Sequence, residues 1–465
     1  MVDELPIFFG HLFGGAYSTD EMNKIWSERN FVQKILDIEA ALAKAQAELG
    51  IIPKWAAEEI INAVNRGFPP EEIAKVKSKA KHIMVSTIYA FQEKLGEAGE
   101  YFHLGPTTQD ILDTSLTLMM IDSLKVIISS LREFEKALIE QAVKYKDAVM
   151  AGRTHGQHAV PITFGLKLAI WATEVREHIE RLKSVLDRIG YISLSGAVGT
   201  MASFVAIVGY DEGKVFEMLE RTAKYLGLKA PHIDLHQRMD RFAEVVSVMS
   251  LVSSSLGKIG LEIRDLSREE VKEVFEPWVM GIHGSSTMPQ KRNPEPSEWL
   301  EGIAKIVRVF PVSMNSVTMQ HERDATRTAS QFLVLPLTFM LTHAQIKSAI
   351  RIIGGLQVFT KRMLENMMVS KGFMAAEPVM LKLAERTGKK VTAHKIIYEV
   401  SQKAIEEGKS FKEVLLESEE VMKYLSKADI EKLVELERYI GTSIRQIEKI
   451  VNDIKVKRDE EEINK

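Results

Sequence analysis

The stretch TTQDILDTSLTLMMIDSLKVIISSLREFEKALIEQAVKYKDAVMA, residues 107–151, contains neither glycine nor proline. Apolar residues such as Leu112, Leu116, Met119 and Leu124 recur along it at helical spacing, and nothing in it would end a helix early. A single helix of this length would be on the order of 65 Å long, at about 1.5 Å per residue. Because ordinary globular helices are much shorter, this stretch indicates a bundle of unusually long helices.

Other segments repeat the helical pattern. Residues 166–189 lie between two glycines and place a stripe of apolar side chains on one face of a predicted helix. Further helices are predicted over residues 236–256, 298–309 and 313–335. No convincing alternation of apolar and polar residues with period two occurs, so we expect little or no sheet. The predicted fold class is all-α.

Two breaks suggest domain limits. Gly105-Pro106 forms a turn just before two threonines that can cap the long helix, and Gly354-Gly355 precedes shorter, more charged segments. We therefore predict an N-terminal helical domain at 1–105, a central long-helix bundle at 106–353 and a C-terminal helical domain at 354–465. Apolar stripes as wide as those of the central helices usually bury a second face against other subunits. An oligomer is therefore expected.

Composition limits the possible chemistry. The chain has no cysteine, which excludes disulfides, thiolate catalysis, iron–sulfur clusters and cysteine-bound zinc. A formal net charge of -3 argues against a chain-wide attraction to nucleic acid or anionic lipid. The N-terminal residues lack the basic region of a signal peptide, and no apolar run approaches the roughly 20 residues of a membrane span. We expect a cytoplasmic protein without nucleic-acid or membrane partners.

Residues 284–294, Gly-Ser-Ser-Thr-Met-Pro-Gln-Lys-Arg-Asn-Pro, interrupt the helical background. Two prolines and the Gly-Ser-Ser cluster predict a loop, and a polar surface turn is one interpretation of it. The loop also holds two cations, an amide and several hydroxyls. Lys291 and Asn293 suit a carboxylate, since one supplies a point charge and the other supplies directional donors. A serine of this loop would act as a base only if the site stabilised its alkoxide.

These eleven residues resemble the signature loop of the fumarase/aspartase superfamily. Gly152-Arg153-Thr154-His155-Gly156-Gln157-His158-Ala159 and Gly196-Ala197-Val198-Gly199-Thr200 resemble the adenylosuccinate lyase branch of that superfamily. His103-Leu104-Gly105-Pro106-Thr107-Thr108-Gln109-Asp110 is similar to the superfamily's first motif region. The resemblance implies a lyase with a three-domain, all-helical fold, a central bundle that assembles into a tetrameric helical core, and no cofactor.

The resemblance also implies roles for individual residues. Ser285 matches the general base that takes a proton from carbon, and His155 matches the general acid that protonates the leaving nitrogen. His82 matches a second histidine that positions His155 or the substrate. Removing a proton beside a carboxylate creates an aci-carboxylate dianion, and Lys291 and Asn293 match the residues that stabilise this added charge.

Further substrate contacts are implied by the same resemblance. They are Thr107, Thr108, Thr154, Arg323 and Arg327. The expected partner is a small molecule that carries two carboxylates. Active sites in the superfamily draw on three subunits, which implies that His82, His155 and Ser285 of one site come from different chains of a homotetramer.

His155 and His158, three positions apart, also admit other interpretations: a zinc pair, or two satisfied core histidines. No third ligand is evident nearby, and the surrounding Arg-Thr-His-Gly-Gln pattern favours the lyase interpretation, so no metal is expected. The chain also lacks a phosphate-binding Gly-x-x-x-x-Gly-Lys loop and a dinucleotide-binding Gly-x-Gly-x-x-Gly motif.

The leaving group is less well defined by the sequence. Adenylosuccinate lyases usually begin Arg-Tyr-Ser-x-x-Glu-Met, with the arginine and tyrosine on the nucleotide phosphate, whereas this chain has Ala16 in place of the arginine. The downstream serine and arginine of that phosphate site fall on Thr328 and Phe332. Two missing arginines would forfeit contacts worth roughly 1.5–3 kcal/mol each. Arg327 is the candidate replacement for one of them.

Four functions are compatible with these residues. Adenylosuccinate lyase, a carbon–nitrogen lyase of purine biosynthesis, ranks first, and a fumarate-releasing lyase with a non-nucleotide leaving group ranks second. A 3-carboxy-cis,cis-muconate cycloisomerase ranks third, because residues 38–53 lean toward it while the Thr154-His155 pair favours elimination. A non-catalytic structural protein, like some superfamily members of the eye lens, ranks last, since it would not need these catalytic residues together.

Overall fold

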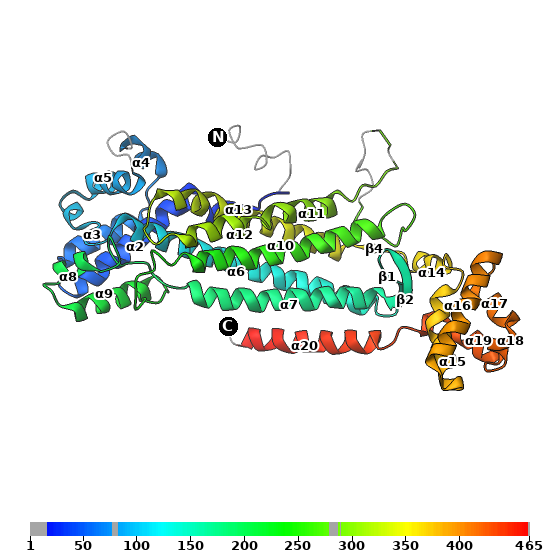
Figure 1. Ribbon diagram of the computed structural model, residues 1–465. Coiled ribbons are helices and arrows are strands. Elements are labelled where there is room, and N and C mark those ends of the chain that lie inside the picture. The colour runs from blue at the N-terminus through cyan, green and yellow to red at the C-terminus, as the bar shows by residue number, and fades with distance from the viewer. Residues whose placement is uncertain (1–15, 77–81, 279–286, 289, 464–465) are drawn as a thin grey trace. The chain divides into compact units, whose positions relative to one another are not determined.

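The computed structural model describes residues 16–76, 82–278, 287–288 and 290–463 (Figure 1). Helices hold 72% of the residues and strands only 4%, which confirms the all-α fold class. The predicted base Ser285 falls in the segment 279–286, outside the described residues.

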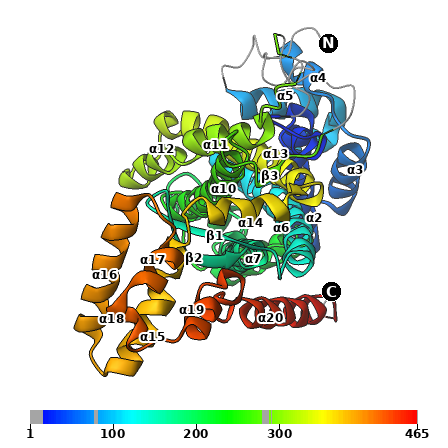
Figure 2. The ribbon, with the colours of Figure 1, turned by 90° about the vertical axis from the view of Figure 1, so that its right-hand side faces the viewer.

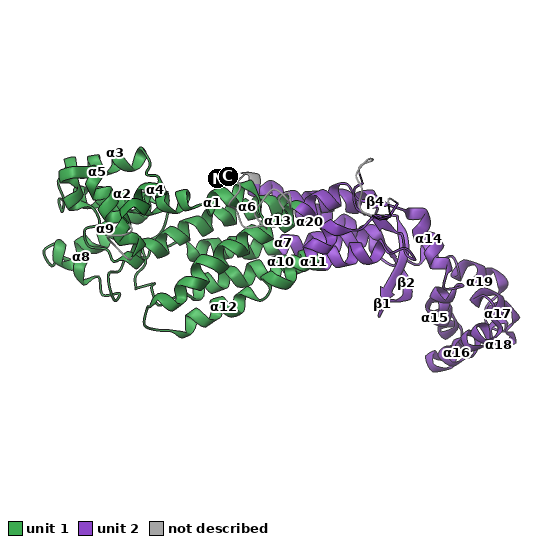
Figure 3. Cartoon of the chain, turned by 90° about the horizontal axis from the view of Figure 1, so that it is seen from above, with its two compact units in different colours: residues 1–132, 178–257, 301–347 green, residues 133–177, 258–300, 348–465 purple. Residues whose placement is uncertain are grey.

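The chain forms two compact units, coloured separately in Figure 3. Unit 1 comprises residues 1–132, 178–257 and 301–347, and unit 2 comprises residues 133–177, 258–300 and 348–465. Each unit is thus assembled from three separate stretches of sequence. The three-domain division at residues 105 and 354 stays a prediction.

Within the described residues, five helices have residues in both units. They are α6 (Thr108–Lys144), α7 (Phe164–Ile189), α10 (Asp240–Leu266), α11 (Glu295–Val307) and α13 (Leu335–Gly354). With 37 residues, α6 confirms the very long helix predicted from the absence of glycine and proline. The helix predicted at 166–189 is confirmed by α7, and α10 continues well past the predicted end at 256.

The predicted end of the longest helix was wrong. Instead of continuing to Ala151, α6 stops at Lys144, and the chain enters strand β1 (Val149–Thr154), which pairs antiparallel with β2 (Gln157–Thr163). A second small antiparallel sheet joins β3 (Val274–Phe275) to β4 (Gln357–Val358). The limited sheet content agrees with the prediction, but the hairpin at the His155 motif was not predicted.

A long-range contact, rather than a local breaker, ends α6. The Phe164 N–H donates to the Ala148 carbonyl (2.8 Å) and the Gly165 N–H donates to the Tyr145 carbonyl (2.9 Å). A Cβ atom on Gly165 would lie 2.6 Å from the Ala142 carbonyl oxygen, so only glycine allows this close approach. The first residues of α7 therefore bond to carbonyls that an extended α6 would have used itself.

The helix predicted over 313–335 was also wrong, because the chain is interrupted there. The segment consists of α12 (Phe310–Ser316), η5 (Val317–Met319), η6 (Ala325–Arg327) and the π-helical turn η7 (Ser330–Val334), which leads into α13. Asp324 begins a new helical turn by accepting a hydrogen bond from the Thr326 N–H (2.8 Å). Such local side-chain capping competes with a continuous helix.

The remaining helices of unit 1 build its N-terminal core. They are α1 (Asp20–Ile25), α2 (Glu28–Glu48), α3 (Lys54–Asn65), α4 (Pro70–Val76), α5 (Ile83–Leu95), η4 (Gly96–Tyr101), α8 (Ala202–Ile207) and α9 (Glu212–Tyr225). The ring of Phe91 meets Phe68 edge-on and also contacts Phe102, which is buried in the same cluster. This core fixes the segment that leads into α6.

The C-terminal part of unit 2 is a set of shorter helices (Figure 2). They are α14 (Thr360–Met368), η8 (Phe373–Ala375), α15 (Ala376–Thr387), α16 (Lys390–Glu407), α17 (Phe411–Glu417), α18 (Glu419–Met422), α19 (Lys427–Leu433), η9 (Leu436–Arg438) and α20 (Ser443–Ile463). Capping boxes start α17 and α19. The apolar core shared by the helices from α14 to η9 includes Val149 and Ala151 of β1, so these helices also support the hairpin.

Candidate active site

His155 lies at the tip of the β1–β2 hairpin. Because Thr154 pairs with Gln157, the loop between the strands has two residues, His155 and Gly156, with φ of 55° and 74°. Positive φ at both positions is the mark of a type I′ turn, which glycine adopts freely and histidine tolerates better than most residues. The side chains of Thr154 and His155 are exposed. The predicted acid is therefore presented to solvent from a tightly defined turn.

An ion pair with a buried carboxylate anchors this hairpin. The Arg153 guanidinium donates through Nη1 to Glu273 Oε2 (2.9 Å) and through Nη2 to Glu273 Oε1 (2.7 Å). The Glu273 side chain is fully buried, and it also accepts a hydrogen bond from Asn366 Nδ2 (2.8 Å). Two parallel bonds fix the orientation of the guanidinium plane as well as its distance.

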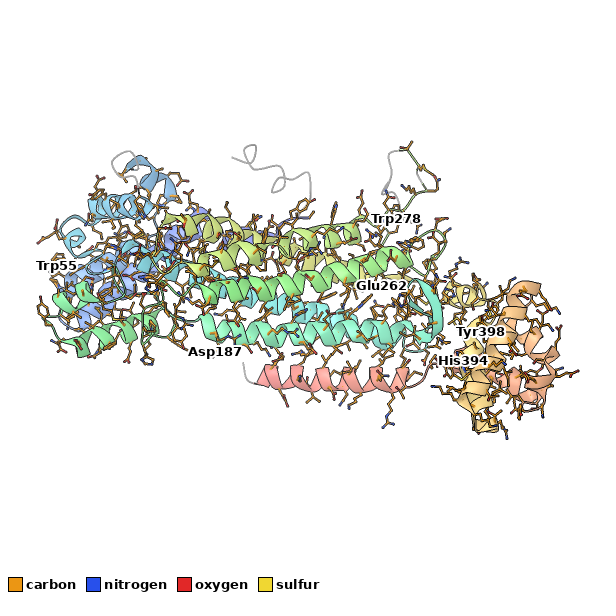
Figure 4. All side chains as sticks on the ribbon, in the orientation of Figure 1. Trp55, Asp187, Glu262, Trp278, His394 and Tyr398 are labelled. Atoms are coloured by element: carbon orange, nitrogen blue, oxygen red, sulfur yellow. The ribbon has the colours of Figure 1, made fainter. Side chains whose placement is uncertain are left out.

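His158 lines a cavity of about 550 Å³ beside the hairpin in unit 2. Its walls include Arg153, Lys167 and Glu262, the last of which is labelled in Figure 4. Desolvation lowers the pKa of His158, and the positive charge of Arg153 lowers it further. No group of three or more metal-binding side chains occurs in the described part of the chain.

The described end of the signature loop carries the two predicted carboxylate-binding residues. The Lys291 N–H donates to the Met288 carbonyl (3.0 Å), and the Lys291 side chain is exposed. Asn293 is half-buried. The Arg292 guanidinium lies over the ring of Trp278, 5.0 Å from its centroid, and Trp278 is labelled in Figure 4. This cation–π contact joins the chain before the loop to the chain after it.

A second contact ties the two ends of the loop together. Glu276 Oε1 accepts hydrogen bonds from the Ser297 N–H (2.7 Å) and the Ser297 hydroxyl (2.5 Å), at the start of α11. Burial raises the pKa of Glu276, although the bonds from Ser297 oppose that shift. The segments on both sides of the loop thus form a fixed frame within unit 2.

Thr107 and Thr108 lie where α6 begins in unit 1. Asp110 accepts a hydrogen bond from the Thr107 N–H through Oδ2 (2.7 Å), and its own N–H donates to the Thr107 carbonyl (3.0 Å). Both threonines are half-buried. Their hydroxyls stand at the positive end of a long helix, which suits a substrate carboxylate.

Asp110 connects this helix start to a second motif. Its Oδ1 accepts from the Ser195 N–H (2.7 Å) and lies 2.9 Å from His236 Nε2, and its Oδ2 accepts from the Gly196 N–H (3.1 Å). The other ring nitrogen of His236 lies 3.2 Å from Asp234. The carboxylate of Asp110, which is fully buried, therefore holds together the segments around residues 107 and 196.

Arg323 and Arg327 extend the same network. Arg327 is only 4% exposed, donates to the His236 carbonyl (2.5 Å) and lies 3.3 Å from Asp113 Oδ2. Desolvation lowers its pKa, although Asp113 opposes the shift. Arg323 is half-buried and donates to the Ala197 carbonyl (2.7 Å). Arg327 is thus committed to the framework of unit 1, and its contact with substrate stays a prediction.

The three departures from the phosphate pattern also lie in unit 1. Ala16 is buried and Thr328 is exposed. Phe332 packs edge-on against Phe31, with ring centroids 5.4 Å apart. None of the three supplies a donor of the guanidinium type, so any anion bound here would rely on other cations.

His82 is the N-cap residue of α5. Its Nδ1 accepts a hydrogen bond from the Met84 N–H (3.2 Å), and the side chain is exposed. Because His82 belongs to unit 1 and His155 to unit 2, the positioning of one by the other stays a prediction.

His103, in the first motif region, gives a test of the pH dependence of stability. Its Nδ1 lies 2.5 Å from the buried Glu39 carboxylate. Burial alone would lower the pKa of His103, but the charge of Glu39 and its hydrogen bond raise it above the usual 6.5. A base whose pKa rises on folding stabilises the fold fully below its unfolded pKa and loses that contribution as pH rises through its folded pKa.

We therefore expect the melting temperature to fall as pH rises above the ordinary histidine range. The double variant His103→Gln/Glu39→Gln, which removes both charges, should show a smaller fall between about pH 6 and pH 9. Thermal unfolding of both proteins at several pH values between about 6 and 9 measures how far the melting temperature falls. If the melting temperature falls equally with pH in the wild type and in the double variant, the His103–Glu39 pair does not contribute to the pH dependence of stability.

The structure thus groups the predicted residues by unit. Unit 1 holds His82, Thr107, Thr108, Arg323 and Arg327, and unit 2 holds Thr154, His155, Lys291 and Asn293. Sequence reasoning missed the framework residues Asp110, Asp113, Ser195, Asp234 and His236, and the pair Arg153–Glu273. Asp110 and Asp113, two carboxylates among the apolar residues of the first turns of α6, were the available signal, because buried carboxylates need partners.

Comparison with known families gives two matches. A family model described as Lyase matches residues 15–309, and one described as Adenylosuccinate lyase C-terminus matches residues 372–450. The first match covers more than half of the chain and includes the start of α6, the hairpin and the signature loop.

Individual relatives match over nearly the whole chain. An adenylosuccinate lyase from Pyrococcus abyssi is 39% identical over 447 residues, which cover 95% of this chain and 97% of the relative. An N-acetyl-S-(2-succino)cysteine lyase from Dickeya dadantii is 36% identical over 443 residues, with 95% and 96% covered. The crystal structure of a 3-carboxy-cis,cis-muconate lactonizing enzyme from Pseudomonas putida matches with a TM-score of 0.87 at 32% identity, covering 95% and 98%. The chain is therefore an enzyme that belongs to the lyase family of the fumarase/aspartase superfamily.

Proposed function

We propose that this enzyme releases fumarate from a succinyl-type substrate by β-elimination, and that adenylosuccinate is that substrate. The observation that carries the proposal is the exposed Thr154-His155 turn, held by the ion pair between Arg153 and the buried Glu273. A scaffold protein has no use for an outward histidine on a turn so closely fixed. The identity to an adenylosuccinate lyase along 95% of the chain supports nitrogen as the leaving atom.

In the proposed reaction, the Ser285 alkoxide takes a proton from the carbon beside a substrate carboxylate. The electrons of that C–H bond move into the carboxylate and form an aci-carboxylate dianion, which Lys291 and Asn293 stabilise with a positive charge and N–H donors. The dianion collapses to fumarate as the C–N bond breaks. His155 delivers a proton to the nitrogen, which keeps the electrons of the broken bond.

The residues of unit 1 hold the rest of the substrate in this proposal. Thr107 and Thr108 bind a carboxylate at the start of α6. Arg323, whose guanidinium donates to the Ala197 carbonyl of the 196–200 motif, is proposed to bind the leaving group, with the buried Arg327 as a second cation of the same network. The roles of these four residues remain proposals.

We also propose a homotetramer in which each site draws on three subunits. Several large apolar side chains of unit 1 stay exposed, among them Leu251, Ile306, Val309, Val312 and Met319, which is 86% exposed. They lie on α10, on α11 and in the segment that follows α11. Exposed apolar side chains gathered on neighbouring elements usually mark a contact with another subunit.

A second substrate has specific support. The phosphate arginines of adenylosuccinate lyases are replaced by Ala16 and Phe332, and the side chain of Phe332 packs against Phe31. A thioether such as N-acetyl-S-(2-succino)cysteine, the substrate in the name of one relative, has no phosphate to bind. Its carbon–sulfur bond would break in the same elimination, with a thiol in place of the amine.

A direct comparison of the two substrates tests the proposal. The purified enzyme is supplied with adenylosuccinate or with N-acetyl-S-(2-succino)cysteine, and fumarate is measured by its absorbance. We expect kcat/KM for adenylosuccinate to be higher by at least about tenfold, a difference of about 1.4 kcal/mol in transition-state stabilisation. The reverse preference would assign the thioether reaction, and no fumarate from either substrate would contradict the proposed function.

We also propose a cytoplasmic location, and we propose a role in purine biosynthesis because the proposed substrate is adenylosuccinate. In the described part of the chain, α10 and the segment Ala325–Gly354 reach the length and apolarity of a membrane span. Most of each window, 67% and 61%, is buried inside the folded chain. Burial of this kind is typical of core helices, which supports the proposal.

A further inference from the structure

We infer that Glu273 is a positioning residue for the catalytic acid, and that it acts through Arg153 to hold the turn that presents His155. The inference rests on the proposed function, since it gives His155 the role of the acid. It concerns residues of unit 2 alone.

The hairpin needs an anchor because its own pairing is weak near the tip. The strand register shifts between Ala151 and Arg153, at Gly152, where a Cβ would lie only 2.4 Å from the Val160 carbonyl oxygen. Only the pairs Arg153–His158 and Thr154–Gln157 separate this bulge from the turn. A bulge locally disrupts the ladder, so these few pairs alone would allow the tip to twist.

Glu273 is itself held in place, so it can anchor the tip of the hairpin. Its N–H donates to the Leu266 carbonyl (2.9 Å), and its carbonyl accepts from the Phe359 N–H (3.0 Å) next to β4. Asn366 Nδ2 donates both to Glu273 Oε1 and to the Val271 carbonyl, each at 2.8 Å. The backbone of Glu273 is therefore held on both sides, and its carboxylate is held by a side chain of α14.

The chemistry of the pair suits positioning rather than catalysis. Because the Glu273 side chain is fully buried, it does not reach solvent or substrate. Arg153 lies two residues before His155, near the end of strand β1. A change in the orientation of its guanidinium therefore shifts the backbone of the turn. A bidentate pair fixes direction, whereas a lysine in place of Arg153 would keep a point charge without the fork. Misplacing a reacting group by about 1 Å can cost about a hundredfold in rate.

Unit 2 offers a matched control. Arg176 donates to Glu135 through Nε (2.7 Å) and Nη2 (2.6 Å), and the Glu135 side chain is likewise fully buried. This second bidentate pair joins α7 to α6, and both of its members also bond to α20, Arg176 to Glu461 (2.7 Å) and Glu135 to Arg458 (3.0 Å). Its loss should destabilise the fold in a similar way without moving His155.

The test compares Glu273→Gln with Glu135→Gln in the full-length enzyme. We expect Glu273→Gln to lower kcat for fumarate release by about 10- to 100-fold, with KM changed less than about threefold, while Glu135→Gln keeps kcat within about threefold. Both variants should lower the melting temperature. Arg153→Lys, at a partly exposed position, serves as a second variant and should lose kcat to a similar extent.

A second readout separates the acid from the rest of the site. Substrate recovered from D2O after partial turnover shows how often the base removes the proton from carbon and returns it. In Glu273→Gln, as in His155→Gln, we expect this deuterium uptake to persist while fumarate release falls. Equal losses of uptake and release, or the same fall of kcat in Glu135→Gln, would overturn the inference.

A third readout needs no substrate. Amide hydrogen exchange at residues 154–157 should be faster in Glu273→Gln than in the wild type, and unchanged in Glu135→Gln. Unchanged exchange in Glu273→Gln would contradict the anchoring role. Failure of the proposed function, by contrast, would be seen in the wild-type enzyme itself, as the absence of fumarate from both succinyl substrates.

Discussion

Replacing Ser285 with alanine is expected to lower kcat by several powers of ten while KM changes little. The reason is that a general base acts in the transition state, so its loss removes stabilisation that the bound substrate does not have. A steady-state assay of fumarate release, with the dissociation constant of a substrate analogue, separates the two effects.

Folding should be unaffected by this change. The loop that carries Ser285 is flanked by contacts that the substitution leaves alone, namely Glu276 with Ser297 and Trp278 with Arg292. Melting curves and oligomeric state should therefore match those of the wild type.

The neighbouring serine provides the control. Ser286→Ala changes the same loop by the same atom, and it should cost far less activity than Ser285→Ala. If the two variants lose activity equally, or Ser285→Ala keeps more than about a tenth of kcat, the base lies elsewhere.

Mixing two inactive tetramers should restore activity. His155→Gln and Ser285→Ala proteins each lack one group at every site. In a shared site, the acid comes from one subunit and the base from another. After dissociation, random mixing and reassembly, half of the acid positions and half of the base positions are wild type. About a quarter of the sites should then hold both groups, by the symmetry of the shared interfaces.

Fumarate release and native mass measurements on the reassembled protein test this expectation together. Each variant taken through the same procedure alone is the control and should stay inactive. Mixed tetramers that form and remain inactive would show that each site lies within one chain, and the shared architecture would have to be abandoned.

The long helices were predictable because their signal is local. Helical periodicity and the absence of glycine and proline in residues 107–151 are properties of neighbouring residues, and α6 follows them. The ends of the helices were less predictable. The stop at Lys144 depends on hydrogen bonds from Phe164 and Gly165, which lie beyond a strand and a turn that the periodicity does not indicate.

The candidate site shows the same difference between local features, which the sequence predicts, and contacts between distant residues, which it does not. Motif resemblance proposed Thr107, Thr154, His155 and Lys291 as site residues, because each belongs to a short stretch of characteristic order, and their roles stay predictions. It did not identify Glu273, which stands outside every quoted motif and meets Arg153 only in the folded chain. Nor did it assign Asp110 its partners, since Ser195 and His236 come from other loops of unit 1.

By itself, the sequence determined the fold class and the superfamily, and it predicted which residues carry the chemistry. These follow from composition, helical periodicity and short motifs, none of which depends on contacts between distant residues. Only the tertiary structure decided that His155 stands at positive φ on a two-residue turn, and that Asp110 and Glu273 hold the predicted residues in place. The physical reason is that a buried carboxylate is stable only with partners, and those partners come from residues far apart in the chain.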